Sequence, residues 1–341
     1  MATTMKGWQY AAAVTTHLEK CIVLDESIPA PTKSSLARGQ LLVEVIMAAI
    51  NPIDYKLPES GRLGAIMMSP PAIPGLDFCG RIVGLHSSVT HLKEGQLIFG
   101  AHAQAARYGT LGQLIVIPSG QCALLPAGVK ISDAAAIGTA AITAYQSYPP
   151  DRVKPGSKVF INGGSGGTGT FGIQFAKAMG AEVTVSCSTA NIQLCKSLGA
   201  DEVIDYKTTD ILVELQKKGP VFDLAVDNAA VPASLYENSP TFLKPEGRFM
   251  QVSMDLSFRS LGGAFTRSLR PSFLGGVPRS YTFVRNVSNT KDFTQIGKWM
   301  AEGKVRAVID EVFELEDAPK AFEKLRQGHS RGKILVRVGK E

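Results

Sequence analysis

A glycine-rich segment restricts the fold of this chain more than any other part of its sequence. Residues 161–169 read INGGSGGTG, with five glycines between Gly163 and Gly169. The segment follows an apolar run, KVFIN, and precedes a helical pattern, TFGIQFAKAM, and a second apolar run, EVTVSC. Strand, glycine turn, helix and strand in this order predict a βαβ unit in which something approaches the backbone too closely for side chains.

Three of these glycines match the dinucleotide-binding pattern G-x-G-x-x-G. Gly164 stands where the pattern needs a tight turn, Gly166 where the backbone approaches a pyrophosphate, and Gly169 where helix and strand pack closely. The phosphates are then expected at the helix N-terminus, where unpaired N–H groups attract anions. We therefore predict a dinucleotide site; a glycine-rich turn that binds nothing is the alternative.

The end of the second apolar run indicates which dinucleotide is favoured. NAD-binding proteins carry Asp or Glu there to hold a ribose hydroxyl, whereas this chain reads SCSTAN at 186–191. The hydroxyl and amide groups of Ser188, Thr189 and Asn191 suit the oxygens of a 2′-phosphate. NADP(H) is thus the expected cofactor. Ser188 and Thr189 are also typical helix caps, and that alternative stays open.

The pattern of the sequence changes near residue 132 and again near residue 287. Residues 1–131 contain short β-type runs separated by Gly and Pro, which predicts an antiparallel, β-rich body. Over 132–286, six apolar runs alternate for the most part with helical patterns, which predicts a doubly wound parallel sheet. Residues 287–341 read helix, strand, helix, strand, and we expect them to return to the β-rich body. The predicted fold class is α/β, with two domains.

Composition and charge exclude several other classes of protein. The net charge of +6 is spread over the chain, without the basic stripe of a nucleic-acid-binding protein. The five cysteines include no C-x-x-C pair, which argues against a disulfide framework or a zinc finger. No apolar run is long enough to span a membrane, and neither end carries a secretory or address signal, so a cytoplasmic location is expected.

Several longer motifs resemble the medium-chain dehydrogenase/reductase superfamily, in its zinc-independent quinone oxidoreductase and fungal trans-acting enoyl reductase branch. The motifs cover nearly the whole chain: AAINPIDYK (48–56), PGLDFCG (74–80), AAAIGTAAITAY (134–145), INGGSGGTG (161–169), SLGADEVIDY (197–206) and GHSRGKILVRV (328–338). The resemblance implies a GroES-like, β-rich catalytic domain and a Rossmann domain, with the active site in the cleft between them.

The resemblance also implies a set of cofactor-binding residues. Asn51 and Thr139 match positions beside the nicotinamide, and Lys333 matches a cofactor contact from the C-terminal tail. The pyrophosphate loop corresponds to Gly164, Ser165, Gly166, Gly167, Thr168 and Gly169. The adenosine and 2′-phosphate pocket corresponds to Ser188, Thr189, Asn191 and Tyr206. Relatives often carry Arg or Lys at 190 or 191, where this chain has Ala190 and Asn191, and losing that charge weakens the expected preference for NADP(H).

The same comparison bears on metal binding. Zinc-dependent members of the superfamily hold a catalytic zinc ion with a Cys, a His and a second Cys. The matching positions here are Asn51, Leu76 and Thr139, which supply neither thiolate nor imidazole. A structural zinc ion would need four cysteines near residues 100–112, and that segment has none. We therefore expect no metal.

The expected chemistry follows from the missing metal. Without a Lewis acid, the natural hydride acceptors are a C=C bond conjugated with a carbonyl group, or a quinone, because these acceptors delocalise the incoming charge themselves. The resemblance thus implies an NADPH-dependent enoyl or quinone reductase. Lys56 is expected to stabilise an enolate or contact cofactor phosphates, and Tyr55 to donate a proton, with Asn51 and Thr139 completing the catalytic set. A solvated Lys56, a packed Tyr55 and a proton from water are the alternatives.

Substrate and partners stay open between a few choices. A free small molecule and an acyl thioester carried by a polyketide synthase acting in trans are both expected substrates. We expect no nucleic acid and no membrane partner, and a monomer or homodimer. The Gly275–Gly276 pair is expected in a substrate-side loop. The alternative from another class is a non-catalytic NADPH-binding structural or regulatory protein, crystallin-like and with weak RNA binding.

Overall fold

The protein divides into two compact units, one of them discontinuous in sequence. The computed structural model describes residues 4–12, 14–68, 70–102, 107–253, 267 and 276–340, without the side chains of Arg62 and Leu63. The first unit combines Met1–Ile142 with Val287–Glu341, and the second is Thr143–Asn286. The expected loop at Gly275–Gly276 lies partly outside the described residues.

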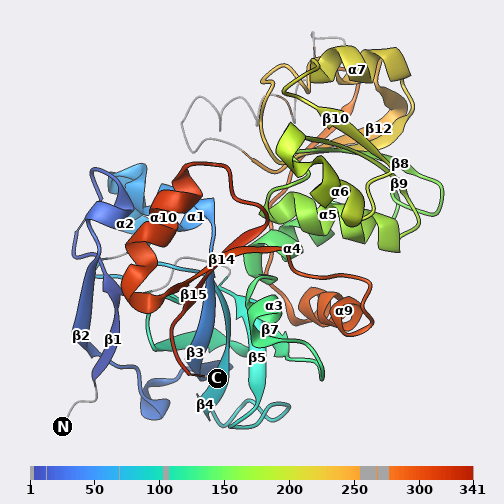
Figure 1. Cartoon of the computed structure of the whole chain (residues 1–341). Coiled ribbons are helices and arrows are strands. Elements are labelled where there is room, and N and C mark those ends of the chain that lie inside the picture. The colour runs from blue at the N-terminus through green and yellow to red at the C-terminus, as the bar shows by residue number, and fades with distance from the viewer. Residues whose placement is uncertain are drawn as a thin grey trace. The chain divides into compact units, whose positions relative to one another are not determined.

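The first unit contains a two-stranded ribbon and a seven-stranded, mainly antiparallel sheet (Figure 1). The ribbon pairs β1 (Thr4–Gln9) with β2 (Val23–Pro29). The larger sheet has the order β14-β15-β3-β4-β5-β7, with β6 also beside β3. Its strands are β3 (Gln40–Ile50), β4 (Asp77–Leu85), β5 (Leu97–Ala101), β6 (Leu114–Pro118), β7 (Cys122–Leu124), β14 (Ile309–Glu314) and β15 (Lys333–Arg337). Because β3 pairs with β4, β6 and β15, it joins three parts of the chain.

The C-terminal segment completes this unit, with the elements that its sequence predicts. Helix α9 (Thr290–Ala301) buries Phe293 and Ile296, and helix α10 (Ala318–Arg326) connects β14 to β15. Strand β15 pairs antiparallel with β3, so that Ile334 lies opposite Ile50, and Figure 1 shows this red strand beside the blue one. The pairing of β14 with β15 is parallel, unlike the antiparallel pairing expected of the β-rich body, because a helix connects them.

The remaining helices of the first half include one departure from the prediction. Helices α1 (Pro52–Lys56) and α2 (Arg62–Met68) follow β3. The run DAAAIGTAAITAYQSY has the composition of one continuous helix, which the sequence predicts, but the structure forms two helices there, α3 (Ile131–Ala135) and α4 (Gly138–Gln146). The break precedes Gly138, where a buried carboxylate from β4 approaches the chain, as described below. Strands β1 and β7 were not predicted, because neither contains a clear apolar run.

The second unit is the doubly wound parallel sheet that the sequence predicts. All six strands are parallel and lie in the order β10-β9-β8-β11-β12-β13, the arrangement of a dinucleotide-binding fold. The strands are β8 (Lys158–Asn162), β9 (Glu182–Cys187), β10 (Glu202–Asp205), β11 (Phe222–Asp227), β12 (Leu243–Gln251) and β13 (Ser280–Phe283). Helices α5 (Gly167–Ala178), α6 (Ile192–Ser197) and α7 (Ile211–Lys218) connect the first four of these strands in chain order. The carboxyl end of β8, where the strand order reverses, leads into the glycine loop.

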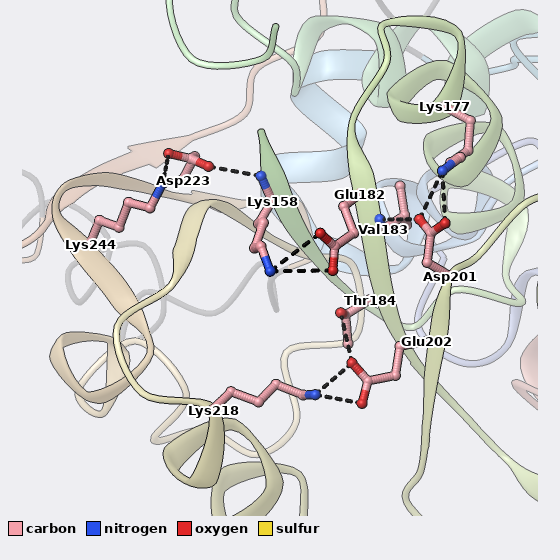
Figure 2. Close-up of polar contacts among 10 residues, drawn as sticks. All are labelled: Lys158, Lys177, Glu182, Val183, Thr184, Asp201, Glu202, Lys218, Asp223 and Lys244. Carbon is pink, nitrogen blue, oxygen red and sulfur yellow. Dashed lines mark hydrogen bonds and ion pairs between the residues drawn. The ribbon is translucent and has the colours of Figure 1, made fainter. Parts of the chain in front are cut away.

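Ion pairs connect the elements along the opposite, amino-terminal edge of this sheet (Figure 2). The pairs are Lys158–Glu182, Lys177–Asp201, Lys218–Glu202 and Lys244–Asp223. Two of these carboxylates also accept backbone N–H groups: Asp201 from Val183 at 2.6 Å and Asp223 from Lys158 at 2.8 Å. The charged side chains at this edge thus connect structural elements to one another. The glycine loop lies at the other edge of the sheet. No helix in the described part of the chain is long and apolar enough to cross a membrane.

Candidate active site and family

The glycines of the loop are required for different reasons. Gly163, with φ of 81°, makes the turn that the sequence assigned to Gly164. A Cβ atom on Gly164 would lie 2.9 Å from the Val185 side chain, and one on Gly169 would lie 2.1 Å from the Gly163 carbonyl oxygen. At Gly166 the nearest atom of the described residues would be 4.0 Å from such a Cβ atom, and the φ of −77° suits any residue. Neither the protein's packing nor its backbone therefore requires glycine at 166, and this open position at the start of α5 fits a bound phosphate group.

A buried polar network fixes the strand ends beneath this loop. The Asn162 Nδ2 group donates to Asp227 Oδ1 at 2.8 Å, and Gln251 Nε2 donates to Asp227 Oδ2 at 2.9 Å. Ser186 Oγ donates to Asn162 Oδ1 at 2.6 Å and accepts from the backbone N–H of Gly163 at 3.0 Å. Hydrogen bonds thus connect the carboxyl ends of β8, β9, β11 and β12. The sequence reasoning missed these residues, although a polar residue at the end of each apolar run was the available signal.

Two of the residues expected around the adenosine, Ser188 and Asn191, lie together with Ser165 of the glycine loop. Asn191 Nδ2 donates to Ser165 Oγ at 3.0 Å and to Ser188 Oγ at 3.2 Å, which connects the glycine loop with the segment after β9. The Asn191 Oδ1 atom is buried and has no partner in the described structure. Tyr206 is about half exposed, at 47%, and the Lys207 ammonium lies 5.6 Å from the centre of its ring. Lys207 is a cation in this region that the sequence reasoning did not single out.

An acid also reaches this region, from the neighbouring strand. The Thr189 hydroxyl donates to Asp205 Oδ2 at 2.6 Å, and this hydrogen bond lowers the pKa of Asp205 below its ordinary value. Asp205 ends β10, which pairs with β9 so that Asp205 lies opposite Cys187. Although β9 itself ends without an acid, the Asp205 carboxylate therefore places a negative charge near Ser188 and Thr189.

In the first unit, Asp77 is the centre of a buried polar cluster. Its Oδ1 atom accepts from the N–H of Thr139 at 2.7 Å and from the Thr139 hydroxyl at 2.6 Å. Its Oδ2 atom accepts from Asn51 Nδ2 at 2.8 Å and from Lys333 Nζ at 3.2 Å. A Cβ atom on Gly138 would lie 2.0 Å from the Asp77 carboxyl carbon, so glycine is required for the carboxylate to reach the start of α4. Three expected site residues thus meet at a carboxylate to which the sequence reasoning gave no role.

The Lys333 ammonium is buried in this cluster, with only 3% of the residue exposed. Besides Asp77, it donates to the carbonyl oxygen of Ile50 at 3.1 Å and to Asn51 Oδ1. A lysine ammonium has three donors, and these three acceptors account for all of them. The expected contact of Lys333 with the cofactor stays a prediction, while its internal role in holding β15, β3 and β4 together follows from the geometry.

Helix α1 carries the two other expected catalytic side chains. The ring of Tyr55 packs beneath the Arg326 guanidinium, whose central carbon lies 4.2 Å from the ring centre. Burial raises the pKa of Tyr55, and Arg326 is itself held by ion pairs with Glu19 and Glu59. The Lys56 side chain is half-buried, and its ammonium has no hydrogen bond or ion pair within the described structure. Tyr55 is therefore engaged in packing, whereas Lys56 is available to a ligand.

The comparisons with known proteins identify the family of the chain. Residues 37–127 match the family described as alcohol dehydrogenase GroES-like domain, and residues 198–336 the family described as zinc-binding dehydrogenase. The chain is 44% identical to the trans-enoyl reductase pgmF of Aspergillus terreus, over 98% of this chain and 97% of that protein. The chain belongs to the medium-chain dehydrogenase/reductase superfamily. Within the superfamily, it falls in the branch of the fungal trans-enoyl reductases, and it is an oxidoreductase that uses a nicotinamide cofactor.

Two further relatives show how broad this superfamily is. A zinc-type alcohol dehydrogenase-like protein of Schizosaccharomyces pombe is 34% identical over 98% of this chain and 97% of that protein. The solved structure of the quinone oxidoreductase from Coxiella burnetii superposes with a TM-score of 0.83 at 27% identity, covering 98% of this chain and all of that one. The fold class inferred from the sequence is thereby confirmed.

One matching family is described as zinc-binding, so the residues of the buried cluster bear on whether it fits a zinc ion. Zinc sites in proteins use thiolate, imidazole and carboxylate ligands. Here Asp77 is surrounded by an amide, a hydroxyl and the Lys333 ammonium, a cation that already neutralises the carboxylate. Within the described residues, no three His, Cys, Asp or Glu side chains gather as metal ligands. This cluster does not fit a zinc ion, and the expected absence of zinc from the whole protein stays a prediction.

Proposed function

We propose that this oxidoreductase is an NADPH-dependent, zinc-independent reductase that acts on a C=C bond conjugated with a carbonyl group, or on a quinone. The observation that carries the proposal is the open position at Gly166, where the protein itself does not require glycine. Together with the superfamily membership, it supports a cofactor pyrophosphate at the start of α5. When bound, the nicotinamide of this cofactor supplies a hydride.

Several residues support NADPH rather than NADH. Ser188, Asn191 and Tyr206 are the groups proposed for the 2′-phosphate and adenosine, with Lys207 as the missing positive charge beside Tyr206. Charge-assisted hydrogen bonds to phosphate are roughly twice as strong as neutral ones. Asp205 opposes this preference, because its carboxylate repels a phosphate. The proposed order of affinity therefore depends on whether Lys207 outweighs Asp205.

On the substrate side, Lys56 is the proposed group for the developing negative charge. Its ammonium is half-buried and has no partner in the described structure, so it is free to hydrogen-bond an enolate oxygen. Asn51 and Thr139 are proposed to lie beside the nicotinamide, in positions fixed by Asp77. Tyr55 remains a weaker candidate for the proton donor because its ring packs against Arg326, and water is the alternative.

The proposed substrate class follows the fungal relatives that the chain resembles. Those relatives are named trans-enoyl reductases, which supports an α,β-unsaturated acyl thioester, delivered by a polyketide synthase acting in trans. A free enone or quinone is the second candidate, favoured by the structural likeness to a quinone oxidoreductase. A cytoplasmic location and a monomeric or dimeric state are proposed with either substrate.

An initial-rate assay tests the proposal. The protein is given NADPH or NADH with an enoyl thioester, an alkenal, an enone and a quinone, before and after treatment with a chelator. We expect reduction of at least one acceptor with unchanged rates after chelation, and NADPH binding about tenfold tighter than NADH, or about 1.4 kcal/mol. Tyr206→Ala should weaken the binding of NADPH more than that of NADH, and Asp205→Asn should strengthen the binding of NADPH. Cofactor binding without reduction of any acceptor would instead favour the non-catalytic alternative, and rates lost on chelation would overturn zinc independence.

A further inference from the structure

The buried carboxyl group of Asp77 accepts as many hydrogen bonds as a carboxylate can. Oδ1 accepts two from Thr139, one from its N–H and one from its hydroxyl. Oδ2 accepts one from Asn51 Nδ2 and one from the Lys333 ammonium. The two oxygens of an ionised carboxylate offer about four lone-pair sites. Because donors occupy all of them, no site is left for a proton, and Asp77 has no hydrogen to donate.

This arrangement fixes the direction of the Thr139 hydroxyl. A hydroxyl group has one hydrogen to donate and two lone pairs that accept. Since Asp77 only accepts, the hydrogen of Thr139 Oγ1 lies toward the carboxylate, 2.6 Å away between oxygens. Within the described residues, no N–H or O–H group donates to Thr139 Oγ1 in return. The hydroxyl therefore offers a ligand lone pairs and no hydrogen.

Thr139 is also the member of this cluster that a ligand can reach. Asp77, Lys333 and Asn51 are 0%, 3% and 5% exposed, whereas Thr139, in the first turn of α4, is partly exposed. The buried members hold one another in place, because the Lys333 ammonium donates to Asn51 Oδ1 and to Asp77. A ligand beside Thr139 thus meets a hydrogen-bond acceptor whose direction is set from inside the protein.

We propose that Thr139 Oγ1 accepts a hydrogen bond from the carboxamide N–H₂ of the nicotinamide, with Asp77 as the positioning residue that keeps the hydroxyl hydrogen away from the ligand. The inference rests on the proposed function, which puts Thr139 beside the nicotinamide. The carboxamide N–H₂ is the one hydrogen-bond donor of that ring. The same direction excludes Thr139 as a donor to the enolate oxygen, so that Lys56, Tyr55 or water must supply this hydrogen bond.

Equilibrium binding of cofactor analogues tests the proposal apart from catalysis. The full-length protein is titrated calorimetrically with NADP⁺, with its 3-acetylpyridine analogue, whose methyl ketone has no N–H, and with its thionicotinamide analogue, which keeps the N–H₂ group. We expect the acetylpyridine analogue to bind about tenfold more weakly than NADP⁺, because Thr139 Oγ1 loses its donor. The thionicotinamide analogue should bind within about threefold of NADP⁺.

Variants then assign this preference to the Thr139 hydroxyl. Thr139→Val removes the acceptor, so a folded protein should bind NADP⁺ and the acetylpyridine analogue within about threefold of each other. Thr139→Ser keeps the hydroxyl and should keep the wild-type preference. Thr184→Val is the matched control, because the buried Thr184 hydroxyl also donates to a carboxylate, Glu202 Oε2 at 3.4 Å (Figure 2). This control should also keep the preference.

Asp77→Asn tests the positioning role. Its amide nitrogen belongs on the Thr139 side, because the other side faces the Lys333 ammonium, which needs an acceptor. The Thr139 hydroxyl then accepts from this amide and turns its own hydrogen toward the ligand, where it can donate to a ketone. We expect the preference for NADP⁺ to disappear in this variant. If Asp77→Asn does not fold, the Thr139 variants still decide whether the hydroxyl is an acceptor.

The outcomes that overturn the proposal are distinct from those that overturn the function. Equal binding of NADP⁺ and the acetylpyridine analogue by the wild type would refute it, as would a folded Thr139→Val protein that keeps the preference. A folded Asp77→Asn protein with the wild-type preference would refute the role of Asp77. A wild type that binds none of the three cofactors would overturn the proposed function as well. The expected preference in a protein that reduces no acceptor would count against the reductase alone.

Discussion

At the residue scale, the first unit is organised by one buried ion pair rather than by its hydrophobic residues alone. Lys333 and Asp77 are 3% and 0% exposed in their side chains, and Asn51 hydrogen-bonds to both. Asn51 and Thr139, two of the three positions that the resemblance matches to zinc ligands, thus hydrogen-bond to a carboxylate that an internal cation neutralises. A buried pair of this kind adds little net stability when complete, but removing one member leaves an uncompensated charge.

Replacing Lys333 therefore has a large expected effect on folding. Lys333→Met keeps most of the side chain's volume but removes the ammonium, and we expect the free energy of unfolding of the first unit to fall by about 3–5 kcal/mol. Both tryptophans, Trp8 and Trp299, belong to this unit, so their fluorescence in urea measures it. Adding Asp77→Asn should recover part of the loss, and Lys20→Met on the surface should change little. A loss below about 1 kcal/mol would contradict the role assigned to Lys333.

At the element scale, the loop between β8 and α5 separates glycines needed for packing from one proposed for a ligand. Gly169 brings α5 against the loop carbonyl of Gly163, whereas within the described residues no atom would lie closer than 4.0 Å to a Cβ atom at Gly166. The same substitution at the two positions should therefore have different consequences. The sequence pattern treats these glycines alike, and their surroundings distinguish them.

This contrast provides a matched pair of variants. Gly166→Val should fold with wild-type stability and lose detectable NADPH binding in a fluorescence titration, because the valine side chain occupies the proposed phosphate position. Gly169→Val should lower the free energy of unfolding by more than about 2 kcal/mol, since its Cβ atom would overlap the Gly163 oxygen. A folded Gly166→Val protein that binds NADPH normally would refute the placement of the pyrophosphate.

At the scale of the whole molecule, the first unit depends on chain segments separated by nearly the full sequence. Strand β15 places Ile334 and Lys333 against Ile50 and Asn51, and both apolar residues are 1% exposed. Residues 287–341 are therefore part of the folding of the N-terminal β-rich body and not an appendage to the dinucleotide-binding sheet. A destabilising substitution near the C-terminus should therefore also destabilise β3.

Hydrogen exchange can detect this dependence. Ile334→Asp buries a charge beside Ile50, and we expect amide protection to fall throughout β3, while β8 and β11 in the second unit keep theirs. Lys340→Asp, near the exposed end of the chain, is the control and should leave both patterns unchanged. Unchanged protection of β3 in the Ile334 variant would show that the C-terminal segment is not needed for the first unit.

The sequence by itself determined the features that arise from neighbouring residues. The apolar runs and the helices between them predicted the six parallel strands, because periodicity is local and an apolar strand must be covered on both faces. Glycine spacing indicated the dinucleotide loop, and motifs indicated the superfamily, which the comparisons confirmed. The roles of the individual site residues, including Lys56, Tyr55 and Tyr206, stay predictions.

Only the tertiary structure decided which polar groups meet. Asn51, Asp77, Thr139 and Lys333 are far apart in the sequence and are brought together by the pairing of β3 with β4 and β15. Nothing local distinguishes a buried lysine from a solvated one, or shows in which direction the Thr139 hydroxyl donates. The cost of burying a charge depends on every group within a few ångströms, and those groups come from distant strands. The fold class follows from local pattern, whereas the chemistry of this site depends on contacts that form only when the chain folds.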